Sequence, residues 1–228
     1  MIRGVVFDID DTLYLERDYV RSGFDHVART IGKTDEEARV LSAWLWAAFE
    51  DGVRGDTFDR LREAFPEVGQ RSSTADLVEA YRTHRPSIDL LPGTVGVLET
   101  LGRHGTRLGV LSDGPVRSQA AKADALGLGR WFDPVLLTSA SGTAFHKPGT
   151  AGFEAIARGW TLSPAELVYV ADNPAKDFAG PRALGWLTVR LRHECQLRYA
   201  LEPVGDADRP EIEVASIEDL PSSLGLDD

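Results

Sequence analysis

Residues 5–13 read Val5-Val6-Phe7-Asp8-Ile9-Asp10-Asp11-Thr12-Leu13, and this stretch decides the fold. It joins a short β-branched and aromatic run, typical of a buried strand, directly to three carboxylates. Like charges a few ångströms apart raise one another's pKa, and burial adds to the cost, so such a cluster needs compensation. Carboxylate oxygens favour a hard divalent cation such as Mg²⁺. Taken alone, the stretch is also compatible with an Asp-rich turn that caps a helix.

Similar strand signals return in the second half of the chain. Apolar runs occur at 107–111, 134–137, 167–171 and 187–191, with a weaker one at 212–214. Each run is short and almost continuously apolar, as expected of strands buried on both faces of a parallel sheet. Helical patterns separate these runs from residue 94 onward. The alternation predicts an α/β fold with a doubly wound parallel sheet.

The helices of this region are predicted from their periodicity and their end signals. They are expected over residues 94–104, 116–126, 149–158, 175–184 and 216–224. Pro181 should kink or end the fourth of these helices, because proline removes a backbone donor. Ser163-Pro164-Ala165-Glu166 forms a capping box that predicts one more helix start.

Residues 15–90 follow a different pattern, without strand signals. Val20, Phe24, Val27 and Ile31 share one helical face, and further helices are expected over 58–65 and 75–82. Another capping box, Thr34 to Glu37, should open a helix in between. The sequence therefore predicts a core domain, residues 1–14 and 91–228, interrupted by an all-helical domain at 15–90.

Polar side chains follow the other predicted core strands. Ser112-Asp113-Gly114 follows the second strand, Asp172 follows the fourth, and Lys147 precedes a helix. In an open α/β sheet, ligands bind beyond the carboxyl ends of the strands. Asp8, Ser112, Asp172 and Lys147 should therefore meet there. Two carboxylates, a hydroxyl and an ammonium suit a metal-bound phosphoryl group.

These motifs together resemble the haloacid dehalogenase-like (HAD) hydrolase superfamily, subfamily I. Its Asp-x-Asp-x-Thr motif is matched by residues 8–12, its strand-end hydroxyl by Ser112, its lysine by Lys147, and its acidic pair by Asp172 and Asp177. The four motifs occur in family order and span nearly the whole chain. The resemblance implies a Rossmann-like core with strand order 5-4-1-2-3 and a type 1 helical cap. Asp113 departs from the family pattern, which commonly has Asn there.

The resemblance also implies a phosphatase mechanism. Asp8 would attack phosphorus and become an aspartyl phosphate. Asp10 would protonate the leaving oxygen and then activate water, for which a raised pKa is expected. Thr12 would orient Asp10 by hydrogen bonding, and Lys147 would neutralise both the phosphate and Asp8.

The remaining motif residues would hold the phosphate and a metal ion. Ser112 and the backbone N–H groups of Asp113 and Gly114 would bind phosphate oxygens. Mg²⁺ would be held by Asp8, the main-chain carbonyl of Asp10, Asp172 and Asp177, the last directly or through a further ligand. The implied activity is Mg²⁺-dependent hydrolysis of a small phosphorylated metabolite, either a nucleoside monophosphate or a sugar phosphate.

Several other functions share parts of this pattern. Dehalogenases of the superfamily lack an equivalent of Asp10, because halide leaves without a proton. Phosphonatases use a cap lysine, and Lys33 is the sole lysine between residues 13 and 92. A phosphomutase needs the same acid and nucleophile and stays open. A receiver-like signalling protein, or a protein that only binds phosphoesters, is a further alternative.

Composition limits the partners and the compartment. The 228 residues include 25 Lys and Arg against 36 Asp and Glu, a net charge of −11 that disfavours nucleic acid and anionic membranes. The longest apolar run, 43–49, is far below the roughly 20 residues that span a bilayer. The N-terminal run, broken by Asp8, is expected to be a strand and not a signal peptide. The single cysteine, Cys195, predicts a cytoplasmic protein without an internal disulfide.

Overall fold

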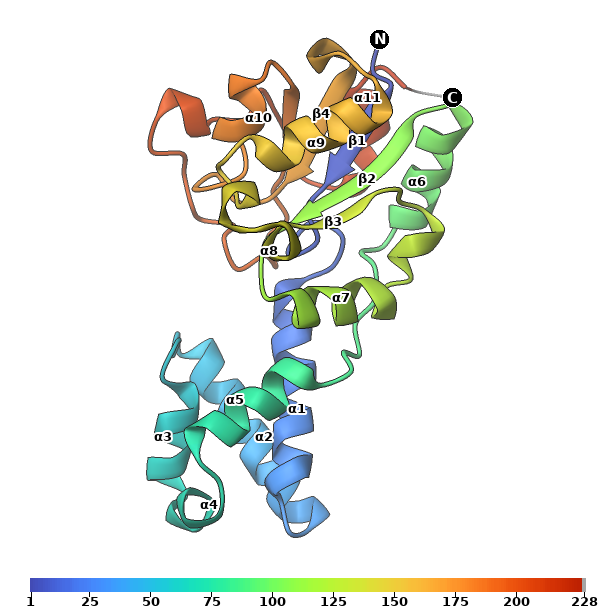
Figure 1. Ribbon diagram of the computed structural model, residues 1–228. Helices are drawn as coiled ribbons and strands as arrows, with labels where there is room; N and C mark the ends of the chain where they lie inside the picture. The colour runs from blue at the N-terminus through green and yellow to red at the C-terminus, as the bar shows by residue number, and fades with distance from the viewer. Residues whose placement is uncertain (227–228) are drawn as a thin grey trace. The chain divides into compact units, whose positions relative to one another are not determined.

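The computed structural model describes residues 1–226 and shows a six-stranded, entirely parallel sheet (Figure 1). The strands are β1 (Gly4–Phe7), β2 (Arg107–Ser112), β3 (Val135–Leu137), β4 (Leu167–Ala171), β5 (Leu187–Leu191) and β6 (Ile212–Val214). Their order is β3-β2-β1-β4-β5-β6. The predicted doubly wound sheet is confirmed, and β6 extends the expected order beyond β5. β1 lies at the centre because its apolar side chains are buried on both faces.

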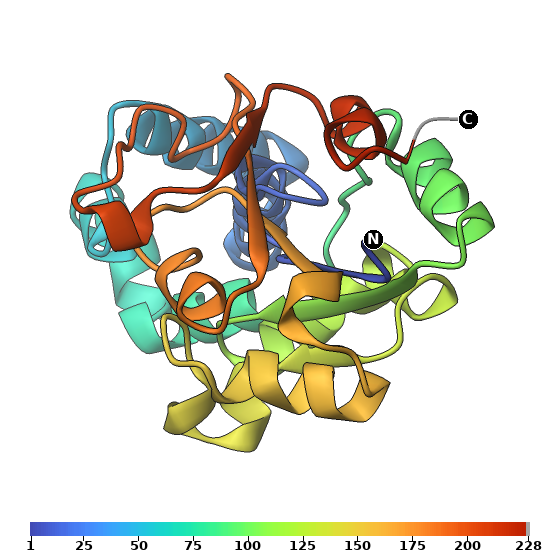
Figure 2. The ribbon, with the colours of Figure 1, turned by 90° about the horizontal axis from the view of Figure 1, so that it is seen from above.

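Helices cover both faces of the sheet, as Figure 2 shows for the core. The core helices are α6 (Thr94–Arg103), α7 (Val116–Ala125), α8 (Thr138–Ser141), α9 (Ala151–Trp160), α10 (Ala179–Ala183) and α11 (Leu220–Ser223). Helices α9 and α10 lie on one side of the sheet, where Phe153 and Trp186 pack edge to face at 5.5 Å. Helices α6 and α11 lie on the opposite side.

Three helix predictions in the core need correction. The helix expected over 216–224 is a 3₁₀ turn, Ile217–Asp219, followed by the four-residue α11. The helix expected over 175–184 begins only at Ala179, because Asn173 folds residues 173–177 into a turn. Its carbonyl accepts from the N–H of Asp177, and its side chain accepts from the N–H of Ala175 at 3.0 Å. Pro181 therefore lies in the first turn, where a missing N–H costs little, and it does not break the helix. The Ser163 capping box is present but begins only a 3₁₀ turn, Pro164–Glu166, that leads directly into β4.

Residues 17–88 form a second compact unit, separate from the unit of residues 1–16 and 89–228. Its helices are α1 (Glu16–Ile31), α2 (Asp35–Glu50), α3 (Thr57–Ala64), α4 (Pro66–Arg71) and α5 (Thr74–Thr83). They enclose their own core of aromatic and branched residues, with Phe24, Leu41 and Leu77 among the buried members. Thr34 caps α2 by accepting from the N–H of Glu37. That this unit acts as a cap domain stays a prediction.

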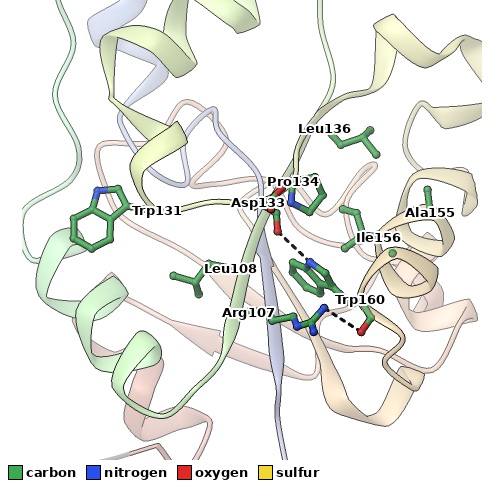
Figure 3. A pocket seen from close by; sticks show the side chains of 10 residues that line it. Arg107, Leu108, Trp131, Asp133, Pro134, Leu136, Ala155, Ile156 and Trp160 are labelled. Atoms are coloured by element: carbon green, nitrogen blue, oxygen red, sulfur yellow. Dashed lines mark hydrogen bonds between the residues drawn. The ribbon is translucent and has the colours of Figure 1, made fainter.

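A cavity of about 670 Å³ lies at the amino ends of β2 and β3. Figure 3 shows how it is built: Trp160 donates its ring N–H to the carbonyl of Asp133 at 3.0 Å, and Arg107 donates to the carbonyl of Trp160 at 3.1 Å. Its walls are mainly apolar, with Leu108 and Ile156 among them. None of the motif carboxylates lines it, so the chemistry suggested by the sequence belongs at the opposite edge of the sheet. In residues 1–226, no helix is long and apolar enough to cross a membrane.

Candidate active site

The predicted site residues meet at the carboxyl ends of β1, β2 and β4. The chain winds from β1 towards β3 on one side and towards β6 on the other, so this edge is the topological switch point of the sheet. A pocket of about 240 Å³ opens there. Its lining is almost entirely polar and comprises Asp8, Asp10, Glu16, Asp113, Gly114, Pro115, Gln119, Lys122, Asp172, Lys176 and Arg198.

Asp8 is buried at the end of β1, where hydrogen-bond donors and two lysines favour its ionised form. Ser112 donates to Oδ1 at 2.8 Å, and the N–H of Ile9 donates to the same oxygen at 2.8 Å. The ammonium of Lys147 lies 3.0 Å from Oδ2 and that of Lys176 lies 3.9 Å away. Burial alone would raise the pKa of Asp8, but the two lysines and Ser112 outweigh it and lower the pKa to about 2. The carboxylate is therefore ionised at neutral pH, as a nucleophile must be.

Asp8, Asp172 and Asp177 form a compact acidic cluster. All three are buried, and one carboxylate oxygen of each lies within 4.8 Å of the others. Burial, and then the charges of Asp177 and Asp8, raise the pKa of Asp172 well above its ordinary value. Oδ2 of Asp172 is buried without a hydrogen-bond partner among the described residues. An unpaired buried oxygen in an all-oxygen cluster fits a hard cation such as Mg²⁺.

Lys147 is the cation buried beneath this cluster. Its ammonium lies 2.7 Å from Asp177 and 3.0 Å from Asp8, and it donates to the hydroxyl of Tyr169 at 2.8 Å. Burial alone would lower the pKa of Lys147, but Asp177 and Asp8 raise it well above its usual range. Asp177 also accepts from the N–H of Asn173 at 3.0 Å, which fixes it across the turn before α10. The lysine is therefore protonated beside Asp8 at neutral pH.

Asp10 is held in a way that the sequence did not suggest. Lys122 of α7 donates to Oδ1 at 2.6 Å, and Gln119 of the same helix donates to Oδ2 at 2.7 Å. The hydroxyl of Tyr14 also donates to Oδ1. Thr12, expected to orient this carboxylate, instead donates to the main-chain carbonyl of Asp10 at 3.3 Å.

The expected raised pKa of Asp10 is wrong for the ligand-free protein. Burial and the charge of Asp8 raise the pKa, but the ammonium of Lys122 outweighs them, so the net shift is downward. Lys122 and Gln119 were missed because they lie in a helix that carries no family motif. Their three-residue spacing on α7 was the available signal, since it places both on one face.

The loop after β2 provides the surface expected to hold phosphate. Gly114 lines the pocket with a φ of 134°, a conformation that side-chain-bearing residues rarely adopt, so glycine is required there. The additional carboxylate of Asp113 is turned to other partners. Thr138 donates to it at 2.6 Å, and the N–H of Lys147 donates to it at 3.2 Å. The Asp113 carboxylate therefore links the loop after β2 to α8 and to the segment that carries Lys147.

Two arginines and Asp11 support the rim of the pocket. Arg190, buried within β5, donates to the main-chain carbonyl of Asp172 at 3.0 Å and to that of Leu201 at 2.8 Å. A guanidinium nitrogen of Arg198 lies 2.7 Å from a carboxylate oxygen of Glu16. Asp11 accepts from the N–H of Glu16, the first residue of α1, at 2.7 Å. Burial raises the pKa of Asp11 to about 6. Asp11 thus has the helix-capping role that the sequence offered for this turn.

Comparison with known proteins points to one family. The model of the haloacid dehalogenase-like hydrolases matches residues 2–185. The chain is 28% identical over 222 residues to the glyceraldehyde 3-phosphate phosphatase of Methanopyrus kandleri, covering 94% of this chain and 93% of that protein. It is 32% identical over 226 residues to the phosphoserine phosphatase of Thermus thermophilus, covering 83% and 90%.

Solved structures show the same fold. The L-2-haloacid dehalogenase of Xanthobacter autotrophicus, with chloropropionic acid covalently bound, superposes with a TM-score of 0.64 at 20% identity. The match covers 99% of each chain. Similarity at this level shows the shared fold and does not distinguish phosphatases from dehalogenases.

Proposed function

The chain belongs to the haloacid dehalogenase-like hydrolase family, and on this basis we propose that it is a Mg²⁺-dependent phosphomonoester hydrolase acting through an aspartyl phosphate. The observation that supports this most is the environment of Asp8. Its carboxylate is buried and ionised, lies 3.0 Å from the ammonium of Lys147, and adjoins the acidic cluster with Asp172 and Asp177. Phosphoryl transfer mainly requires such positioning and charge neutralisation.

In the proposed reaction, an oxygen of Asp8 attacks phosphorus and the ester oxygen leaves. Ser112 and the N–H groups of the 113–114 loop bind the phosphate oxygens, and Lys147 offsets the charge that Asp8 and the phosphate bring together. Water then attacks phosphorus, releases inorganic phosphate and restores the Asp8 carboxylate. Asp8, the main-chain carbonyl of Asp10, Asp172 and Asp177 would hold Mg²⁺, which when bound neutralises phosphate charge.

Asp10 is the group proposed to move protons in both steps. It is ionised before substrate binds, since the pKa is lowered beside Lys122. An anionic phosphate entering the pocket favours the protonated form of a neighbouring carboxylate, so Asp10 would take up its proton with the substrate. It would then protonate the leaving oxygen and afterwards accept a proton from the attacking water.

Asp10 also separates this proposal from its alternatives. A dehalogenase needs no acid at this position, because halide leaves without a proton. A protein that only binds phosphoesters needs no second carboxylate fixed beside Asp8. A phosphomutase needs the same two acids and differs in returning the phosphoryl group to a substrate. We favour hydrolysis because the relatives that match most of the chain are named phosphatases.

The substrate is proposed to be a small phosphorylated metabolite, either a nucleoside monophosphate or a sugar phosphate. The relatives are named for glyceraldehyde 3-phosphate and phosphoserine, both small phosphoesters, which supports the class and not the individual compound. A panel of phosphorylated metabolites, assayed with Mg²⁺ for phosphate release, would rank the candidates. We further infer a cytoplasmic location from the single, unpaired Cys195.

Metal dependence gives the first prediction. Release of p-nitrophenol from p-nitrophenyl phosphate should fall to background in EDTA and return when Mg²⁺ is added in excess, because Asp8 and Asp172 lose their shared counter-charge. Initial rates at several Mg²⁺ concentrations measure this. Full turnover in metal-free buffer would contradict the proposal.

Asp10→Asn gives the second prediction. The amide can still accept hydrogen bonds but cannot accept the proton of water, so hydrolysis of the aspartyl phosphate should slow by about 10²–10⁴-fold. An activated ester such as p-nitrophenyl phosphate should still phosphorylate Asp8 in this variant, because p-nitrophenolate leaves without protonation. Intact-mass spectrometry after an acid quench should therefore show phosphoenzyme accumulating in the variant and little in the wild type. Equal, low phosphoenzyme levels in both would oppose the assigned role.

A further inference from the structure

Helix α7 has polar side chains on its buried face. It buries the polar side chains of Ser118, Gln119 and Lys122, while Val116 at its start is exposed. Burying lysine and glutamine is costly unless their polar groups are paired. Lys122 and Gln119 both donate to the carboxylate of Asp10, and Gln119 also donates to the hydroxyl of Ser112 at 3.1 Å.

Hydrogen bonds to both carboxylate oxygens fix the side chain of Asp10. The Lys122 side chain is 7% exposed and the Asp10 side chain is 18% exposed, so the 2.6 Å ion pair is largely shielded from water. Gln119 holds the other oxygen at 2.7 Å and also donates to the main-chain carbonyl of Asp113 at 2.6 Å. Tyr14 adds a hydroxyl bond to the oxygen that Lys122 holds. A carboxylate restrained at both oxygens has little freedom to rotate away.

We propose that Lys122, with Gln119, is a positioning residue that fixes the Asp10 carboxylate for proton transfer to the leaving oxygen. The inference rests on the proposed function, since it assigns Asp10 a proton to deliver. Lys122 acts through Asp10 and is not itself the acid. The ion pair contributes orientation, because an acid that is misplaced by a rotamer change delivers its proton poorly.

Leaving-group dependence tests this role. Phenyl phosphate and p-nitrophenyl phosphate have similar shapes, but phenolate is much the poorer leaving group and depends on protonation. In Lys122→Met, kcat/KM for phenyl phosphate should fall about 100-fold, while kcat/KM for p-nitrophenyl phosphate should fall by less than about 5-fold. Lys122→Arg, which keeps the charge, should recover most of the loss on phenyl phosphate.

Controls separate positioning from folding. Arg130→Met removes an exposed cation just beyond α7 and should leave both rates unchanged. Thermal unfolding shows whether Lys122→Met folds, and if it does not, Gln119→Leu should show the same selective loss. Equal losses on both esters, or no loss, would overturn the positioning role while leaving the proposed function intact. Absence of wild-type turnover of either ester would remove the proposed function and this role with it.

Discussion

Asp8→Asn is expected to reduce turnover by roughly 10⁴-fold or more, because the amide nitrogen cannot form the aspartyl phosphate on which both steps depend. The substitution is nearly isosteric, and the hydrogen bonds from Ser112 and the N–H of Ile9 reach an oxygen that asparagine retains. The loss should therefore appear in kcat. Because the fold favours the ionised Asp8 beside the buried Lys147, the neutral amide should also lower the unfolding temperature, so kcat is measured well below that temperature. Phosphate release at saturating substrate and Mg²⁺ measures it.

The matched control is Asp124→Asn, which removes an exposed carboxylate from α7. It should retain wild-type kcat. If Asp8→Asn kept more than about a tenth of the wild-type rate, transfer through a covalent intermediate on this residue would be excluded.

Asp172→Asn should stabilise the metal-free protein while removing its response to Mg²⁺. Burial and the neighbouring charges of Asp177 and Asp8 make the ionised Asp172 unfavourable in the fold. Neutralising it should raise the free energy of unfolding by about 1–2 kcal/mol, or roughly 3–6 °C in unfolding temperature. Adding Mg²⁺ should raise the unfolding temperature of the wild type and leave that of the variant unchanged.

The sign of the pH dependence follows from the direction of this shift. A carboxyl group whose pKa is raised by folding contributes its full stabilisation at pH values below the pKa of the unfolded chain. That contribution is lost as the pH rises through the pKa of the folded protein. The advantage of Asp172→Asn in EDTA should therefore be small near pH 4 and largest above pH 7. Asp89→Asn, an exposed acid, is the control and should show no such trend. A variant that is less stable than wild type at every pH would show that Asp172 is not under electrostatic strain.

The sheet and the acidic motifs were predictable because their signals are local. Strands such as Leu167–Ala171 are continuous apolar runs, and both Leu187–Leu191 and Ile212–Val214 have the predicted bounds. Asp8 and Asp172 follow strand ends, so parallel topology alone brings them to one edge. The short α4, Pro66–Arg71, was not predicted because six residues carry too little periodicity.

The polar network around the motifs was not predictable, since it depends on tertiary packing. Arg190 lies inside an apolar strand, and nothing in the sequence shows that its guanidinium holds the backbone of Asp172. Lys122 resembles a solvated helix lysine until α7 is placed against Asp10. The expectation of a raised pKa for Asp10 was wrong because the local sequence shows only its acidic neighbour, Asp8. The cation that lowers the pKa, Lys122, is 112 positions away in the chain.

The most direct test of the central claim is to identify the residue that carries phosphorus. Protein incubated with p-nitrophenyl phosphate and Mg²⁺ would be quenched in acid and treated with borohydride, which reduces an acyl phosphate to an alcohol. Peptide mass spectrometry would then locate the modified residue. The proposed mechanism predicts homoserine at position 8, most strongly in Asp10→Asn and absent from Asp8→Asn. Reduction at Asp10 or Asp172, or no reduction in a protein that releases phosphate, would contradict it.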